Sequence, residues 1–229
     1  IIKGMKRGEP QVYGDEAHKL LRLLGEELKR SLVAISQHSE VASSVGVRAR
    51  EALKTLDAIL LYHRLSTEQT ELLLEPVHVG ASMQTVAHGV EALLREAGCS
   101  AELHIQHGLQ PVTADRKLLE ASLYSLWHGF LQTVEKPSAI VCSARRVRGG
   151  VRVAIHSESS RIDTALFSRF HIESSQPFKA LSGPATNVVA ACGLLSLIEA
   201  RVSRTAHRSG AGLGFTLAFS KQLELLQEY

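Results

Sequence analysis

The stretch L-L-R-L-L-G-E-E-L-K-R-S-L-V-A-I, residues 20–35, decides how the first part of this chain folds. Its apolar residues recur at the spacing of heptad positions a and d, which predicts a helix with one apolar stripe. The stripe consists of Leu21, Leu24, Leu28 and Ile35. Glu26 falls on the opposite side and is expected to face solvent. The stretch therefore predicts a helix that packs against another helix.

A second amphipathic segment follows after a short connection. The first helix is expected to begin at Asp15, which can cap it, and to end near Ser43. A turn over residues 43–46 then leads to a second helix with the same apolar spacing, at Leu53, Leu56, Leu60 and His63. A lone helical hairpin cannot cover its apolar stripe on both sides. We therefore predict a homodimer in which helices 15–43 and 47–70 form a four-helix bundle.

The rest of the chain reads as mixed α+β. Pro76 ends a short extended leader, and a helix is expected from Ser82 or Met83 to Ala97. Periodicity predicts further helices over 114–133 and 188–200, and strands over 100–107, 138–147, 150–156, 201–206 and 213–219. Gly149 and Gly150 mark a hairpin. We expect a linker (1–14), a helical hairpin (15–74) and an α/β domain (75–229).

Composition narrows the classes of function. The net charge is +3 and the 26 Lys and Arg residues look scattered, which disfavours a nucleic-acid partner. The three cysteines form no C-x-x-C pair, so we expect a reducing compartment without disulfides. The eleven histidines show no H-x-x-x-H spacing, so we predict no metal site.

No apolar run reaches the roughly 18 residues that a membrane span needs, and the chain starts without a signal-peptide pattern. We therefore expect a cytoplasmic segment with no direct membrane contact. The chain begins Ile1-Ile2 without a methionine, which is consistent with the cytosolic part of a longer, membrane-linked sensor.

The run G-E-E-L-K-R-S-L, residues 25–32, resembles the H box of sensor histidine kinases, usually S-H-E-L-R-T-P-L. Residues 56–79 resemble the end of the dimerisation helix and the start of the kinase ATP-binding domain. The resemblance covers nearly the whole chain. It implies a dimerisation hairpin followed by an α/β sandwich of the histidine kinase, gyrase and Hsp90 ATPase type, with helices on one face of the sheet.

The H box departs from the family pattern at its reactive positions. Glu26 takes the place of the phosphoacceptor histidine, and a carboxylate has no imidazole nitrogen to form a phosphoramidate. Glu27 matches the acid/base carboxylate of the family. Arg30 stands where phosphatase activity often needs a threonine or asparagine. The resemblance therefore implies a kinase in shape without a catalytic residue at this box.

The nucleotide-binding boxes depart as well. The helix from Asp115 fits the N box, D-x-x-x-L-x-x-x-L-x-N-L-L-x-N-A, but Ser125 and Gly129 replace its asparagines, so magnesium loses its main protein ligand. In the D-x-G-x-G box, Ser157 replaces the aspartate that recognises adenine, which removes a charge-assisted hydrogen bond. The two glycine places of that box hold Ser159 and Arg161.

The last glycine box, G-x-G-x-G, reads Gly183-Pro184-Ala185-Thr186-Asn187. Only Gly183 survives of its three glycines, while Ala185 and Asn187 stand at the other two places. Glycines there let helix-start amides approach the phosphates closely. We therefore expect a degenerate pocket and no cofactor.

Taken together, these replacements favour a pseudo-histidine kinase. Such a module would act in a two-component system as a dimeric scaffold or regulator of a response regulator or partner kinase. One alternative is a histidine phosphotransferase-like relay with His38 as the acceptor. Another is a divergent kinase that still binds Mg-ATP. Nucleic-acid binding through the arginines of residues 145–152 is disfavoured because no aromatic platform accompanies them.

Overall fold

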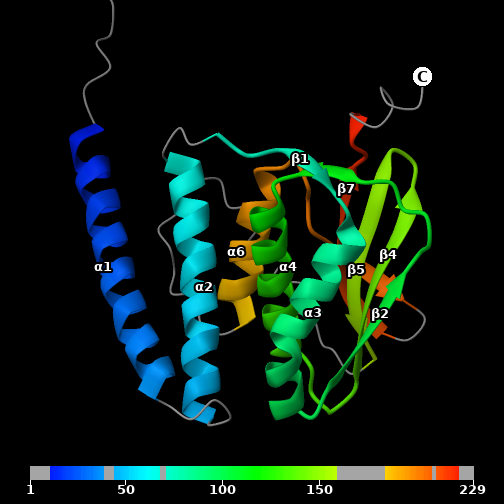
Figure 1. Cartoon of the computed structure of the whole chain (residues 1–229), viewed down its shortest axis with the longest axis horizontal. Helices are drawn as coiled ribbons and strands as arrows, with labels where there is room; N and C mark the ends of the chain where they lie inside the picture. Colours follow the sequence, from blue (N-terminus) through cyan, green and yellow to red (C-terminus); the bar gives the residue numbers. More distant parts are fainter. Residues whose placement is uncertain (1–10, 39–43, 68–70, 159–183, 208–209, 222–229) are drawn as a thin grey trace, which may run out of the picture. The chain divides into compact units, whose positions relative to one another are not determined.

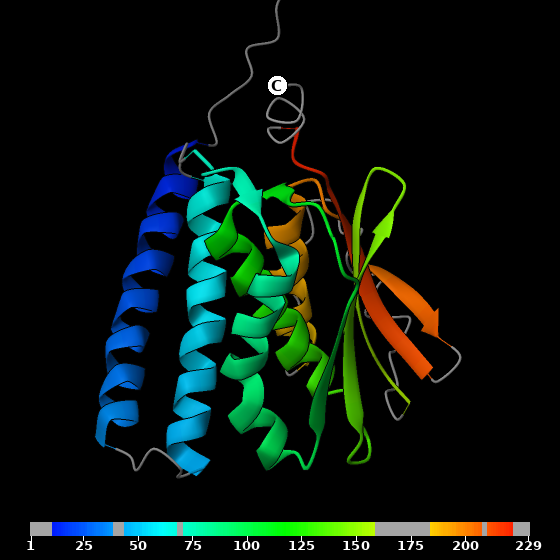
Figure 2. The same ribbon diagram turned by 45° about the vertical axis from the view of Figure 1, so that its right-hand side comes forward.

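The computed structural model describes residues 11–38, 44–67, 71–158, 184–207 and 210–221. It divides into two compact units, residues 1–56 and 57–229, which are described separately below. Figures 1 and 2 show the chain in two orientations.

The first unit contains α1 (Gln11–His38) and the start of α2 (Ser44–Thr67). The predicted helix start at Asp15 is wrong, because α1 already begins at Gln11, directly after Pro10. A proline is tolerated before the first helical turn, and the single Gly14 weakens a helix without ending it. Ser44 and Gly46 lie in α2 and not in a turn. Residues 39–43 lie outside the described part of the chain.

The described residues of the second unit form the end of α2, a two-stranded sheet, a five-stranded sheet and three further helices. Its elements are β1 (Glu75–Val77), α3 (Val79–Glu96), β2 (Ser100–Ile105), β3 (Val112–Ala114), α4 (Arg116–Leu131), β4 (Ala139–Val147), β5 (Gly150–Ser157), α6 (Pro184–Ser196), β6 (Ser203–His207) and β7 (Gly210–Ala218). This composition confirms the predicted α+β class.

The larger sheet has the strand order β2-β4-β5-β7-β6. Strands β2 and β4 run parallel, and the other neighbours run antiparallel. The predicted hairpin is confirmed: Val147 pairs with Gly150, and Gly149 takes the positive φ of 82° that the tight turn needs. Helices α3, α4 and α6 lie on one side of this sheet (Figure 2).

The core forms between that side of the sheet and the helices. Alternate residues of the three central strands point into it, as the period of two requires. They are Ile140, Cys142, Ala144, Val151, Val153, Ile155, Leu213, Phe215 and Leu217. Trp127 and Phe130 of α4 are at most 2% exposed and fill the helix side of the core. The odd residues of β4 and the even residues of β5 and β7 therefore face the other side of the sheet.

Two helix starts in this unit differ from prediction. Helix α3 begins at Val79, three residues before Ser82, because the backbone of His78 is extended and takes the N-cap position. Helix α6 begins at Pro184, although periodicity predicts Val188. Proline is favoured in the first helical turn, since its missing N–H has no partner there in any case. Ala185 and Asn187 of the last glycine box therefore lie inside a helix.

Candidate functional site

The phosphoacceptor position of the H-box-like segment is an exposed carboxylate. Glu26 lies on the surface of α1, in agreement with the prediction. It borders a shallow surface hollow of about 320 Å³ along this helix, lined by Glu26, Lys29, Arg30, Val33, Ala34 and Gln37. The structure thus presents a carboxylate, with no imidazole, at the place where the family presents its reactive histidine.

The two neighbouring H-box positions interact with each other. Arg30 Nη1 lies 3.1 Å from Glu27 Oε2, and both side chains are at least two-thirds exposed. A surface ion pair of this kind adds little stability. The ion pair does engage both positions: Glu27, at the acid/base position of the H box, is bound to Arg30, at its phosphatase position.

The alternative acceptor His38 is exposed and is the last residue of α1. Twelve residues separate it from Glu26, which corresponds to about 18 Å along a helix. His38 therefore does not share a site with the H-box positions on this helix.

The N-box positions on α4 are buried. Ser125 is 1% exposed and Gly129 is also buried. The hydroxyl of Ser125 has no hydrogen-bond partner among the described residues. A buried hydroxyl without a partner is destabilising, and one hydroxyl cannot replace the two amide oxygens of the family box. Within the described part of the chain, no group of three His, Cys, Asp or Glu side chains could hold a metal ion.

The position of the adenine-recognising aspartate is also buried and already hydrogen-bonded. Ser157, at the end of β5, is 1% exposed, and its hydroxyl lies 2.7 Å from that of Ser138. A serine hydroxyl bonded to another serine carries no charge with which to receive the adenine amino group. Ser157 therefore lacks the carboxylate that the resemblance expects at this position.

Helix α6 packs closely against α4 (Figure 1). It carries Asn187, which is 4% exposed, in its first turns, so this position of the glycine box is covered. The other box residues of the prediction, Ser159, Arg161 and Gly183, lie outside the described residues.

His128 is a further polar residue of this helix, and it is 7% exposed. Burial lowers the pKa of its imidazole. Its Nε2 lies 3.1 Å from Gln132 Nε2, so the amide donates to this ring nitrogen in the neutral tautomer that leaves it unprotonated. The lowered pKa favours a neutral imidazole at neutral pH.

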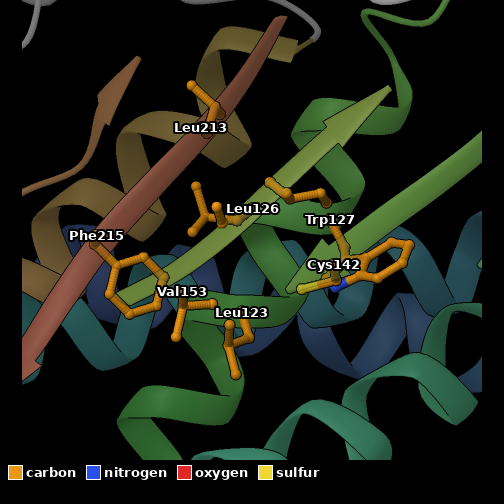
Figure 3. A pocket seen from close by; sticks show the side chains of 9 residues that line it. Leu123, Leu126, Trp127, Cys142, Val153, Leu213 and Phe215 are labelled. Atoms are coloured by element: carbon orange, nitrogen blue, oxygen red, sulfur yellow. The ribbon is translucent and has the colours of Figure 1, made fainter. Parts of the chain in front are cut away.

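A small void in the core is distinct from these positions. Its volume is about 10 Å³, and its lining includes Leu123, Trp127, Cys142 and Phe215 (Figure 3). A void of this size with an apolar lining is too small and too dry for a ligand. It is a packing gap between α4 and the sheet.

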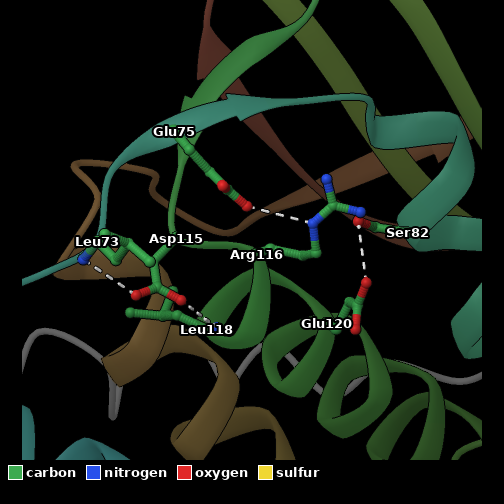
Figure 4. Close-up of polar contacts among 7 residues, drawn as sticks. All are labelled: Leu73, Glu75, Ser82, Asp115, Arg116, Leu118 and Glu120. Atoms are coloured by element: carbon green, nitrogen blue, oxygen red, sulfur yellow. Dashed lines mark hydrogen bonds and ion pairs between the residues drawn. The ribbon is translucent and has the colours of Figure 1, made fainter.

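At the start of α4, two polar contacts that the sequence did not predict join this helix to residues 73–75 (Figure 4). Asp115 caps this helix by accepting from Leu118 N at 3.0 Å, and its other oxygen accepts from Leu73 N at 3.2 Å. Beside it, Arg116 Nε donates to Glu75 Oε1 at 3.2 Å. Both contacts bind residues 73–75 to α4. An aspartate before a helical pattern signals a cap, but its second partner is 42 residues away.

Solved structures of histidine kinases match most of this chain. Acinetobacter baumannii histidine kinase AdeS matches with a TM-score of 0.59 and 16% identity, over 89% of this chain and 98% of AdeS. The catalytic domain of histidine kinase ThkA matches with a TM-score of 0.54 and 14% identity, over 65% of this chain and 97% of that domain. The chain has the fold of a histidine kinase core.

Full-length ShkA, solved in complex with AMPPNP, matches this histidine kinase fold with a TM-score of 0.62 and 17% identity. The match covers 88% of this chain and 46% of ShkA, so the chain spans less than half the length of that protein. No protein-family model and no curated protein matches the sequence. Among the described residues, no helix combines the length and apolar character that crossing a bilayer requires.

Proposed function

We propose that this chain is a catalytically degenerate histidine-kinase-like signalling module. In a two-component system it would act as a scaffold or regulator that binds a response regulator or a partner kinase. The observation that carries this proposal is the exposed Glu26 on a helix of otherwise histidine-kinase fold. A carboxylate in that place cannot accept a phosphoryl group as a phosphoramidate.

The nucleotide side of the fold supports the same conclusion. Ser125 and Gly129 supply no amide oxygen for magnesium, and Ser157 supplies no carboxylate for adenine. Losing one charged hydrogen bond costs about 1.5–3 kcal/mol, which is roughly a tenfold to hundredfold loss of affinity. Losing several together would take a micromolar site beyond millimolar concentrations.

Calorimetric titration with Mg-ATP, and separately with Mg-AMPPNP, is therefore expected to give no heat up to millimolar nucleotide. A thermal-shift assay should agree. ShkA, which was solved with AMPPNP, serves as the positive control in the same buffer. Micromolar binding would contradict the dead pocket, and stable phosphate incorporation from ATP would contradict the whole proposal. Transfer of phosphate from a phosphorylated receiver domain to this chain, lost in His38→Ala, would instead identify the relay alternative.

We further propose that the module is a homodimer that pairs through its first two helices. The apolar stripe of α1 supports this: Leu24, Leu28 and Ile35 are 64%, 57% and 44% exposed in the single chain. Contiguous apolar side chains of this kind mark a protein interface. A second copy of the hairpin offers the matching stripe.

Light scattering at tens of micromolar is expected to give twice the chain mass of 24.9 kDa. Leu28→Glu should reduce the mass to that of one chain, because it places a charge in the apolar contact. Gln37→Glu adds the same charge on the opposite side of α1 and should leave the mass unchanged. A monomeric wild-type chain would remove this part of the proposal.

A further inference from the structure

Four strands of the larger sheet, β4 to β7, lie in two segments of the chain that carry basic residues and no acidic ones. Residues 138–157 and 200–221 contain eight Lys or Arg and no Asp or Glu, so all 23 acidic residues lie elsewhere. These two segments hold β4, β5, β6 and β7. The other 18 of the 26 Lys and Arg residues lie outside these segments, so this is a local basic region within an otherwise scattered distribution.

Two of these arginines are direct cross-strand neighbours. Arg145 of β4 pairs in register with Arg152 of β5, on the side of the sheet that faces away from α3, α4 and α6. Like charges placed opposite each other destabilise a sheet. Neither guanidinium is paired with a carboxylate among the described residues. The fold thus maintains a local repulsion that a single neutral residue would remove.

The guanidinium of Arg152 is held in place. Its Nη2 donates to Ser203 Oγ on β6 at 2.9 Å, and its Nη1 lies 3.5 Å from Thr216 Oγ1 on β7. Ser203 Oγ donates in turn to the carbonyl of Gly214. A side chain at Gly214 would lie 3.1 Å from Arg152 Nη2, so glycine leaves room for the guanidinium to cross β7. The pKa of Arg152 is lowered by burial and then by the Arg145 charge, yet arginine stays protonated in proteins.

Beside this pair the outer face carries short side chains on the central strands, and at its β2 edge it carries Glu102 and His104. In the next row across the sheet, Ser143 pairs with Ala154, Ala154 with Gly214, and Gly214 with Ser203. Short side chains allow another chain to approach the backbone closely. No described element of the second unit covers this face of the sheet.

We propose that this outer sheet face, centred on Arg145 and Arg152, binds an extended acidic segment of a protein partner. Guanidinium forks match carboxylates in a bidentate fashion, and a fixed Arg152 loses less conformational entropy on binding. Nucleic acid fits less well because the described part of this face carries no Phe, Tyr or Trp side chain on which bases could stack. The inference rests on the proposed role as a partner-binding module and names the surface that this role uses.

The test is fluorescence anisotropy of the full chain with labelled oligoglutamate as the probe. The wild-type chain should bind it with an affinity that falls as salt rises. Arg145→Gln should weaken binding about tenfold, the loss of one charge-assisted contact, without lowering the melting temperature. Arg145→Gln with Arg152→Gln should abolish it. Arg95→Gln, an exposed arginine on α3, changes the net charge equally and should bind as wild type does.

Absence of binding, or equal weakening by Arg95→Gln, would overturn the proposal. Tighter binding of single-stranded or duplex DNA that is lost in the same variants would also overturn it, in favour of a nucleic-acid face. The anisotropy titration contains no nucleoside triphosphate, and the calorimetric titration contains no oligoglutamate. The failure of one proposal is therefore visible separately from the failure of the other.

Discussion

Leu118→Ala is expected to destabilise the second unit by about 2–5 kcal/mol, the cost of truncating a fully buried leucine. Leu118 is completely buried on α4 and packs with Ala58 of α2 and with Ala190 and Leu194 of α6. A cavity there loosens three helices at once, since each meets the others at this side chain. Urea unfolding followed by circular dichroism measures the loss.

Hydrogen exchange adds a local readout to the same variant. Because Ala58 loses its neighbour in Leu118→Ala, the amides of residues 57–67 should exchange faster than in the wild-type chain. Exchange in the central strands should change less. Lys117→Ala changes the adjacent exposed residue of the same helix and should stay within about 0.5 kcal/mol of wild type. Equal stability of the two variants would show that this cluster does not stabilise the second unit, to which residues 57–67 of α2 belong.

Stability is expected to fall steeply at alkaline pH because of Cys142. This thiol is 1% exposed in the core, and burial raises its pKa from 9.0 to about 12, although the neighbouring Trp127 indole opposes part of the rise (Figure 3). The unfolded chain therefore loses this proton near pH 9, while the folded chain keeps it. The stabilising contribution is present below about pH 9 and is lost as the pH rises towards 12, by roughly 1.4 kcal/mol per pH unit.

The comparison of Cys142→Ala with wild type isolates this effect from the titration of lysines and tyrosines. Unfolding free energies measured from neutral pH to about pH 11 should fall less steeply in Cys142→Ala. Cys99→Ala, which changes a partly exposed thiol, serves as the control and should keep the wild-type slope. Identical slopes for all three proteins would show that the Cys142 thiol titrates normally in the fold.

Much of the fold follows from local patterns. The apolar spacing of residues 20–35 predicts α1, and the Gly149-Gly150 pair predicts the β4–β5 hairpin, because periodicity and turn chemistry act over a few residues. Helix starts were predicted less well. Asp15 and Val188 gave strong local signals, yet α1 and α6 begin four residues earlier in each case, since nothing between stops helix propagation.

The chemistry of the candidate site was only partly predictable. Residue identity alone shows that Glu26 cannot form a phosphoramidate and that Gly129 offers magnesium no oxygen. Identity does not show that Ser125 is buried without a partner, or that Ser157 is bonded to Ser138. Those properties depend on neighbours that other segments bring.

Local sequence patterns establish the fold class and the candidate positions: an apolar helical stripe, an α+β pattern, and a set of box positions without the reactive side chains. Each of these depends on residue types and short spacings. The tertiary structure decided which distant residues meet. It placed Asp115 on Leu73, buried Leu118 between α2 and α6, and set Arg145 beside Arg152 on a face shared with Ser203. Strand register and helix packing bring such residues together, and no local pattern encodes that register.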